Sequence, residues 1–397
     1  MTDAEVVARW RADTPGVAHR IHLNNAGAGL LPVSVLSAMT DHLRLEARVG
    51  GYEAADLVEP GVRSSYQAIA ALIGTQPRNI AIVENATVAV AQALSAFDFV
   101  PGDIVVTTEA DYVSNQLMLL SLAARRGITI RRAADLPAGG VDPDSLDQLC
   151  RHPRTRLVVL SWIPTNSGLI QDAEAAGRIC AARNIPYLLD ACQAVGQLPV
   201  DVPKIQCDFL AATGRKFLRG PRGIGFLYIS DRMLDAGKYP LFIDLRGGAW
   251  TNPDQFQIAP GAERFENWEF AYASLLGLGE AARYTTAAQA SGGFERAIRL
   301  AALARQQLGS LPGVTLLDRG QHLGAIATAH CKIRPARQLM LALRDRGINC
   351  SAFPRTAAVI DMDRKQVPDG IRISPHYYNT EADIAALGDG LGTLLRT

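Results

Sequence analysis

The 397-residue sequence predicts an α/β protein with a mainly parallel β-sheet. Short, β-rich apolar runs alternate with helical stretches through the middle of the chain, and most of these runs show no alternation of polar and apolar residues. Continuous apolar runs are typical of strands that are covered on both faces, and strands that alternate with helices are typical of a parallel sheet. The predicted strands are Ile80–Val83, Ile104–Thr107, Ile128–Ile130, Leu157–Ser161, Tyr187–Asp190, Phe209–Ala211 and Ile224–Ile229.

Three stretches between or before these strands are predicted to be helices: Val62–Ile73, Thr87–Phe97 and Ala173–Arg183. The first is followed by Gly74, which suits a helix C-cap because glycine adopts the left-handed conformation without strain. Open α/β sheets bind ligands beyond the carboxyl ends of their strands, so we expect the functional site there.

The second half of the chain predicts a change of architecture. Loops are expected from about Asp231 to Gly261, a region that holds three prolines and a Gly-Gly pair, and the chain is expected to end in a helix near Glu381–Leu395. The resulting domain division is an N-terminal segment at 1–20, a large domain at 21–282 and a smaller C-terminal domain at 283–397.

Charge and composition exclude several classes of partner. The chain has 40 Lys and Arg against 39 Asp and Glu, a net charge of +1, so we expect no nucleic acid and no membrane partner. Residues Met1–Asp13 contain several charges and no apolar core of an export signal. The longest apolar stretches, such as Leu117–Ala124, are far shorter than the roughly 20 residues of a membrane span. The sequence therefore predicts a cytoplasmic protein.

The six cysteines show no CxxC spacing, so the sequence predicts no zinc site, no redox motif and no bound metal. Cysteines at this low density in a large domain are typically buried free thiols. They stand at positions 150, 180, 192, 207, 331 and 350.

Asp190 and Lys216 stand out because Asp190 ends an apolar strand and Lys216 lies shortly after another. A carboxylate at the carboxyl end of a strand suits ligand binding, and it suits equally the cap of a following helix. Lys216 lies in a turn between two strands that are predicted to be buried, where a cleft can desolvate its amine. Desolvation lowers the pKa of a lysine, and a neutral lysine amine can form a Schiff base.

These two residues belong to a set of segments that resembles a known family. Taken together and in order, the segments resemble the fold type I pyridoxal-phosphate (PLP) enzymes and, among them, the class V aminotransferase family. That family includes cysteine desulfurases, isopenicillin N epimerase-like proteins and ergothioneine-pathway C–S lyases. The segments are Leu23–Gly27, Gly50–Ala55, Asp190 with Gln193, Gly214–Lys216 with Gly220–Gly223, and Arg372–Thr380.

The resemblance implies a fold, a cofactor and an assembly. The fold is a large domain with a mainly parallel seven-stranded sheet flanked by helices, followed by a smaller α+β domain. The cofactor is pyridoxal 5'-phosphate, the substrate is a small-molecule amino acid, and the assembly is a homodimer.

The resemblance also implies roles at the cofactor ring. Lys216 forms the Schiff base with PLP and moves the Cα proton. Asp190 pairs with the protonated pyridine nitrogen and keeps the ring cationic, so that the ring accepts electrons from Cα. Gln193 matches the residue that hydrogen-bonds the phenolic oxygen. Thr165 aligns with a further ring-oxygen contact that is often Asn in desulfurases, and the adjacent Asn166 stays open as the alternative register.

Four residues are expected at the phosphate. Ala86 and Thr87 open a helix directly after a strand, and the backbone N–H groups of a helix N-terminus suit an anion. The same position suits a plain N-cap. By resemblance, Thr213 and Arg215 are phosphate ligands beside the lysine. Arg215 departs from the His of many relatives, and an arginine also binds phosphate well.

Two further contacts rest on the resemblance. Tyr112 aligns with the aromatic residue that stacks on the PLP ring, a position that is generally His in desulfurases, and its alternative reading is an ordinary loop aromatic. A tyrosine stacks well but is a poor acid–base group near neutral pH. Asn267 lies in a segment that reaches the phosphate of the neighbouring subunit in dimeric relatives.

Two arginines are the candidate substrate ligands. Arg372 matches the family arginine that binds the substrate α-carboxylate, a task that suits guanidinium because it binds carboxylates bidentately. Arg355 is expected nearby, with an ordinary surface arginine as its alternative reading.

One departure bears on the reaction. Desulfurases carry a mobile catalytic cysteine in a loop that corresponds to Pro354–Asp361, and this chain has none there. Persulfide-forming desulfuration is therefore disfavoured. Gly50–Ala55, Ala8–Arg11 and Arg372–His376 most resemble the ergothioneine-type enzymes, so we expect a C–S β-lyase that acts on a cysteine-derived thioether or sulfoxide. An aminotransferase or epimerase of the same family is the alternative.

Overall fold

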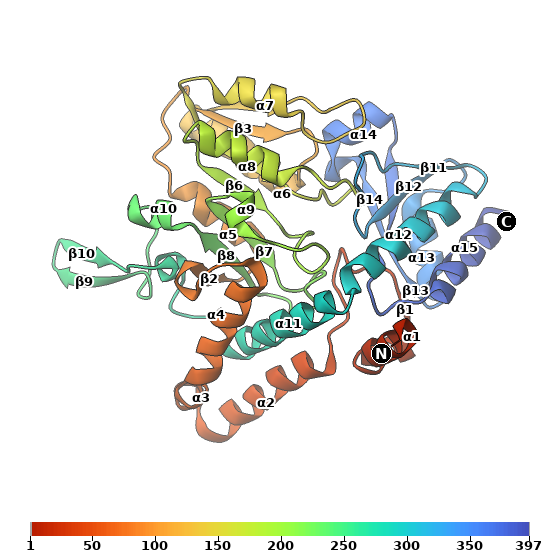
Figure 1. The fold of residues 1–397 in the computed structure, drawn as a ribbon, viewed down its shortest axis with the longest axis horizontal. Helices are drawn as coiled ribbons and strands as arrows, with labels where there is room; N and C mark the ends of the chain where they lie inside the picture. The colour runs from red at the N-terminus through yellow and green to blue at the C-terminus, as the bar shows by residue number, and fades with distance from the viewer. Residues whose placement is uncertain (1, 397) are drawn as a thin grey trace.

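The computed structural model describes residues 2–396 and has a seven-stranded sheet at the centre of its large domain (Figure 1). Four neighbouring strand pairs are parallel, and β8 alone runs antiparallel to both of its neighbours. The predicted α/β class and mainly parallel sheet are therefore confirmed. In spatial order the strands are β2 (Ile80–Val83), β8 (Gly225–Ile229), β7 (Phe209–Thr213), β6 (Tyr187–Asp190), β5 (Thr155–Ser161), β3 (Ile104–Thr108) and β4 (Thr129–Ala133).

Helices cover both faces of this sheet, which explains why its strands are continuously apolar. Alternate residues of the strands point into two separate cores. One core contains α4 (Glu59–Ile73), α7 (Pro143–Cys150), α8 (Ala173–Ala182), the short α9 (Val202–Ile205) and α11 (Tyr272–Ala290). The other contains α5 (Ala86–Ser95) and α6 (Val113–Arg126). Gly74 has a φ of 72° and is the C-cap of α4, as predicted.

The N-terminal segment connects the two parts of the molecule. Trp10 of α1 (Asp3–Ala12) packs on Tyr377, with ring centroids 4.8 Å apart. Strand β1 (Ile21–His22) pairs in parallel with β13 (Ile348–Asn349) of the C-terminal part. Two helices then lead into the large domain, α2 (Val33–Val49) and α3 (Gly51–Leu57), and α2 lies beside α11 (Figure 1).

The predicted loop from Asp231 to Gly261 is wrong in part. The region contains a short helix, α10 (Asp231–Asp235), and an antiparallel hairpin of β9 (Gly248–Asn252) and β10 (Gln255–Ile258). The hairpin projects from the large domain in Figure 1, and most of its residues are exposed. Its second strand, Gln-Phe-Gln-Ile at 255–258, alternates polar and apolar residues, which is a short strand signal that the loop prediction missed.

The C-terminal part is an α+β unit with a four-stranded antiparallel sheet in the order β11-β12-β15-β14. Its strands are β11 (Val314–Leu316), β12 (Ala327–Cys331), β14 (Ser351–Pro354) and β15 (Asp369–Ile373). Its helices are α12 (Gly293–Gly309), α13 (Ala336–Asp345), α14 (Val359–Lys365) and α15 (Glu381–Arg396).

The limits of the domains stay a prediction. The expected boundary between 282 and 283 falls inside the continuous helix α11. Met1 and Thr397, the outer limits of the first and last expected segments, lie outside the described residues.

Within residues 2–396, no helix combines the length and the apolar character that a membrane crossing requires. The same part of the chain has no group of three or more His, Cys, Asp or Glu side chains arranged to hold a metal ion.

Candidate active site

A cavity of about 440 Å³ lies at the edge of the sheet where the adjacent strands β3, β5, β6 and β7 end, and its lining comes from the ends of β3, β6 and β7 and from the start of α5. These strands are neighbours and run parallel, so the loops that follow their carboxyl ends meet at one edge of the sheet. The lining is Asn85, Ala86, Thr87, Val88, Tyr112, Asn115, Asp190, Cys192, Thr213, Arg215, Lys216, Arg222 and Gly223. Seven of the predicted site residues therefore line a single cavity.

Lys216 lies in the turn that follows β7 and is only 6% exposed. Burial lowers the pKa of its amine, although the nearby thiol of Cys192 and carboxylate of Asp190 oppose this shift. The amine lies 5.6 Å from the centroid of the Tyr112 ring. A buried lysine with a lowered pKa beside an aromatic ring suits the nucleophilic role that the sequence predicts.

Asp190 is the last residue of β6 and is also buried. Its Oδ2 accepts a hydrogen bond from Asn115 Nδ2 at 2.9 Å, and its Oδ1 accepts one from the backbone N–H of Cys192 at 2.9 Å. The side chain is therefore fixed as a carboxylate acceptor at the wall of the cavity, which is the position that a cationic ring nitrogen needs.

The predicted phosphate ligands surround the N-terminus of α5. Asn85 caps this helix, because its Oδ1 accepts from the N–H of Val88 at 3.1 Å, and Ala86 and Thr87 form the first turn. The first-turn N–H groups of a helix have no acceptor within the helix and carry partial positive charge. Thr213 and Arg215 approach from the β7 side, and Arg215 Nη1 also donates to the carbonyl of Gly27 at 2.6 Å.

A second group of predicted residues lies together beside the cavity. Gln193 Nε2 donates to Thr165 Oγ1 at 3.3 Å. Arg372 Nη1 donates to the carbonyl of Thr165 at 3.2 Å, and its Nη2 donates to Asn24 Oδ1 at 3.4 Å. The structure thus joins Gln193, Thr165 and Arg372, three residues from distant parts of the sequence.

Arg372 is a buried cation without an acidic partner. It is 6% exposed, and within residues 2–396 it forms no ion pair with a carboxylate. Burial, followed by repulsion from Arg215, lowers the pKa of Arg372 to about 10. Because a buried charge is stable only when it is paired, this guanidinium favours the binding of an anionic ligand.

Asn166 and Thr165 have different surroundings. Asn166 is buried and donates to Asp361 Oδ2 of α14 at 2.6 Å. Its side chain therefore links the large domain to α14, whereas Thr165 contacts the two predicted site residues Gln193 and Arg372.

Two predicted residues lie apart from the cavity. Arg355 is exposed and forms an ion pair with Asp363. Asn267 is also exposed, and its Nδ2 donates to Glu84 Oε1 at 3.3 Å. It lines a neighbouring cavity that shares only Gly223 with the main one. A contact of Asn267 with a partner subunit stays a prediction.

The structure adds residues that the sequence did not indicate. Asp111, Asn115 and Ser161 form a buried hydrogen-bonded group next to Asp190, and Asn24 contacts Arg372. Ser161 ends β5 and lies opposite Asp190 in the register of the sheet, so a polar residue at that strand end was the available signal. Nothing local distinguishes Asp111 or Asn115 from ordinary loop and helix residues.

The cysteines behave as predicted, because all six are free and buried. Cys192 lines the cavity, and burial together with the charge of Asp190 raises the pKa of its thiol to about 12. The segment 354–361, which lacks cysteine, forms a short 3₁₀ turn and the start of α14.

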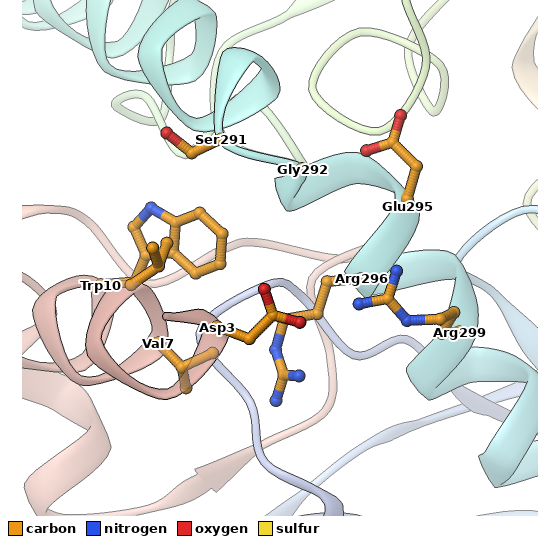
Figure 2. A pocket seen from close by; sticks show the side chains of 9 residues that line it. Asp3, Val7, Trp10, Ser291, Gly292, Glu295, Arg296 and Arg299 are labelled. Atoms are coloured by element: carbon orange, nitrogen blue, oxygen red, sulfur yellow. The ribbon is translucent and has the colours of Figure 1, made fainter. Parts of the chain in front are cut away.

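A separate cavity of about 250 Å³ lies between α1 and the start of α12 (Figure 2). Arg296 at this cavity already donates to the carbonyl of Tyr377 at 3.1 Å and is ion-paired with Glu381 at 3.0 Å. The two cavities share no lining residue, so this one is not part of the candidate active site.

Comparison with known proteins identifies the family. The sequence matches the family described as Aminotransferase class-V over residues 21–387. The chain belongs to the class V aminotransferase family. It is thus a class V enzyme, a family whose cofactor is PLP.

Three similar proteins illustrate the range of this class V family. A probable cysteine desulfurase of Methanothermobacter thermautotrophicus is 27% identical, with 96% of each chain covered. A probable hercynylcysteine sulfoxide lyase of Mycobacterium tuberculosis is 26% identical, with 96% of this chain and 92% of the relative covered. The solved structure of the cystine C–S lyase C-DES, in complex with its product cysteine persulfide, is 25% identical, with a TM-score of 0.84 and coverage of 96% and 99%.

The residues of this class V site fit PLP. An amine, a carboxylate and a helix N-terminus with Thr213 and Arg215 face one cavity, and these groups match the aldehyde, ring nitrogen and phosphate of the cofactor. Among residues 2–396, the buried atoms Gln193 Oε1 and Arg372 Nε lack any hydrogen-bond partner. The site therefore retains polar capacity that a bound molecule can use.

Proposed function

We propose that this class V enzyme is a C–S β-lyase that acts on a cysteine-derived thioether or sulfoxide. The observation that carries the proposal is the position of Arg372 beside the cavity of Lys216 and Asp190, a buried guanidinium that has no acidic partner within residues 2–396. An amino acid bound there has its carboxylate at Arg372 and its Cα within reach of the lysine. The absence of cysteine from 354–361 argues against a persulfide on that segment.

Bound PLP withdraws electrons from the Cα of an amino acid and so labilises the Cα–H bond. In the proposed reaction Lys216 holds the cofactor and removes the Cα proton. Burial lowers the pKa of Lys216, so more of its amine is neutral near pH 7 and can accept a proton. Asp190, held by Asn115 and the Cys192 N–H, stabilises positive charge at the ring nitrogen.

The remaining residues bind and orient. Ala86, Thr87, Thr213 and Arg215 would hold the phosphate, and Tyr112 would cover one face of the ring. Gln193 and Thr165 would contact the ring oxygen. The Cβ–S bond then breaks, the sulfur leaves with the electron pair as a thiolate or sulfenate, and the remaining three-carbon fragment hydrolyses to pyruvate and ammonia.

Two relatives support the choice of elimination, since their names describe a hercynylcysteine sulfoxide lyase and a cystine C–S lyase. The alternative, an aminotransferase or epimerase, starts with the same loss of the Cα proton and uses the same residues.

A product analysis distinguishes the candidates. The purified enzyme is mixed with a cysteine S-conjugate or its sulfoxide, and pyruvate, ammonia and released sulfur species are measured. Elimination gives all three without a second substrate. Transamination gives a sulfur-containing keto acid, and turnover stops after about one equivalent until another keto acid is added. Epimerisation gives only the opposite enantiomer of the substrate.

The proposed enzyme is a homodimer. Large apolar side chains that are strongly exposed in the single chain support this assembly, among them Phe242 at 85%, Trp250 at 81% and Tyr52 at 73%. Asn267 is exposed beside the main cavity, as a residue that reaches a partner's phosphate must be. Sedimentation of the wild type and of Trp250→Asp tests the proposed homodimer. A wild type that is monomeric and fully active contradicts it. We also propose a cytoplasmic location.

A further inference from the structure

A second buried carboxylate lies directly behind Asp190. Asp111 and Asp190 are each 5% exposed, and they share two hydrogen-bonding partners. Asn115 Nδ2 donates to Asp190 Oδ2 at 2.9 Å and to Asp111 Oδ1 at 3.3 Å. Ser161 Oγ lies 2.5 Å from Asp111 Oδ1 and 3.5 Å from Asp190 Oδ2. The two acids therefore belong to one hydrogen-bonded group.

Asp111 is held from several elements by neutral donors. Beyond Ser161 of β5 and Asn115 of α6, its carboxylate accepts from Thr107 Oγ1 of β3 at 3.0 Å and from Gln116 Nε2 at 2.7 Å. Within residues 2–396 it forms no ion pair with Lys or Arg. A buried acid without a cation is unusual.

Asp111 also binds the backbone of Tyr112, which lines the same cavity. Its Oδ1 accepts from the backbone N–H of Tyr112 at 2.7 Å. Tyr112 is the aromatic residue whose ring lies 5.6 Å from the amine of Lys216. The carboxylate of Asp111 thus contacts both Asn115, which donates to Asp190, and the backbone of Tyr112.

We propose that Asp111 is a positioning residue for the cofactor, which holds Asp190 through Asn115 and Ser161 and holds Tyr112 through its backbone N–H. The inference rests on the proposed PLP function. It assigns to Asp111 the alignment of the two side chains that would lie against the ring nitrogen and the ring face.

The direction of the pKa shift of Asp111 agrees with this arrangement. Burial, together with the charge of Asp190, raises the pKa of Asp111, although its hydrogen bonds with Ser161 and Gln116 oppose the shift. Two adjacent buried carboxylates do not both ionise readily. Ser161 Oγ lies between the two acids, so a change of charge at Asp111 affects the surroundings of Asp190.

The test compares apo and cofactor-loaded protein for the wild type, Asp111→Asn and Ser161→Ala. The readouts are the dissociation constant of PLP, the visible absorbance of the bound cofactor as a function of pH, and the melting temperature of the apo protein. Asp103→Asn is the matched control, because Asp103 is 2% exposed, precedes the same strand β3 at its opposite end and pairs with Arg156 at 3.2 Å.

We expect Asp111→Asn to raise the dissociation constant of PLP about tenfold and to shift the pH midpoint of the absorbance change. Ser161→Ala should shift that midpoint in the same direction, and the double variant should show less than the sum of the two effects. Asp103→Asn should lower the melting temperature and leave the affinity and the spectrum unchanged.

Three results would overturn either the inference or the proposed function. A wild-type affinity and spectrum in Asp111→Asn overturn the inference. If Asp111→Asn does not fold, Ser161→Ala decides, and an unchanged midpoint in that variant overturns it equally. A wild-type protein that takes up no PLP overturns the proposed function itself, and this result is distinct because it appears before any variant is compared.

Discussion

His376 donates a hydrogen bond from Nε2 to the carbonyl oxygen of Phe217 at 2.8 Å, one residue beyond Lys216. Its Nδ1 accepts from the backbone N–H of Tyr377 at 2.9 Å, so the ring is neutral and its tautomer is determined. Burial, and then repulsion from Arg219, lowers the pKa of His376 well below its usual value. The turn that carries the lysine is thus held by a histidine from the C-terminal part of the chain.

Protonation of His376 should destabilise the fold. Its pKa is lower in the folded than in the unfolded state, so the unfolded chain binds more protons, and the free energy of unfolding decreases as the pH falls below about 6.5. Glutamine can donate from Nε2 but does not titrate. Urea unfolding between pH 5 and 8 should therefore show a flatter pH dependence for His376→Gln than for the wild type. His19→Gln, at an exposed position, is the control, and an equal slope in wild type and His376→Gln contradicts the assignment.

Lys216→Ala should remove the visible absorbance of bound cofactor and essentially all turnover, since no other described residue places a lysine amine in the cavity. Lys204→Ala is the matched control, because the Lys204 side chain is 71% exposed and pairs only with Asp201 at 3.3 Å. The measurement is an absorbance spectrum together with a rate. Undiminished turnover in Lys216→Ala would show that the central assignment is wrong.

Arg372→Ala should lower kcat/KM for substrates that carry a free α-carboxylate, because a buried charge-assisted pair is lost. The loss corresponds to on the order of 2–5 kcal/mol. Arg372→Lys should recover only part of this, since lysine cannot bind bidentately. Arg355→Ala should have a smaller effect, because Arg355 is exposed and paired with Asp363. If the wild type binds an amino acid and its decarboxylated amine equally well, Arg372 does not bind the carboxylate.

Glu266→Gln should stabilise the protein above pH 7. Burial raises the pKa of Glu266 from 4.5 to about 7, while Oε1 accepts from Tyr66 at 2.6 Å and from the Ile82 N–H at 2.7 Å. The folded state therefore retains a proton that the unfolded state loses, and stability falls as the pH rises from 4.5 to about 7.

A glutamine oxygen keeps both of these hydrogen bonds and has no charge to bury, so the gain at pH 8 should reach up to about 3 kcal/mol. Melting temperatures from pH 5 to 8 measure it, with Glu295→Gln at an exposed position as the control. A loss of stability in Glu266→Gln at pH 8 would mean that the carboxylate is ionised and paired in the folded protein.

Several features of the fold followed from local sequence pattern. The strand at 187–190 could be predicted because it is a short, mostly apolar run, and it is buried because helices cover both faces of the central sheet. The hairpin at 248–258 escaped prediction because its strands are short and lie among prolines and a Gly-Gly pair, although Gln255–Ile258 does alternate polar and apolar residues. Helix α11 spans the expected domain boundary and ends at Ala290, just before Gly292, which has a φ of 77°.

The residues of the candidate site also fall into two groups, those that the sequence indicates and those that only the tertiary structure brings together. The sequence singled out Asp190 at the carboxyl end of an apolar strand and Lys216 in the turn after another, while the roles predicted for them at a cofactor came from the resemblance to the family. The carboxylate behind Asp190 and the ligands around Arg372 were decided only by tertiary structure. Asn115 contacts Asp190 across 75 positions of sequence, and Arg372 contacts Thr165 across 207. Hydrogen bonds between such distant residues leave no local pattern, because sheet register and domain packing, not neighbouring residues, bring them together.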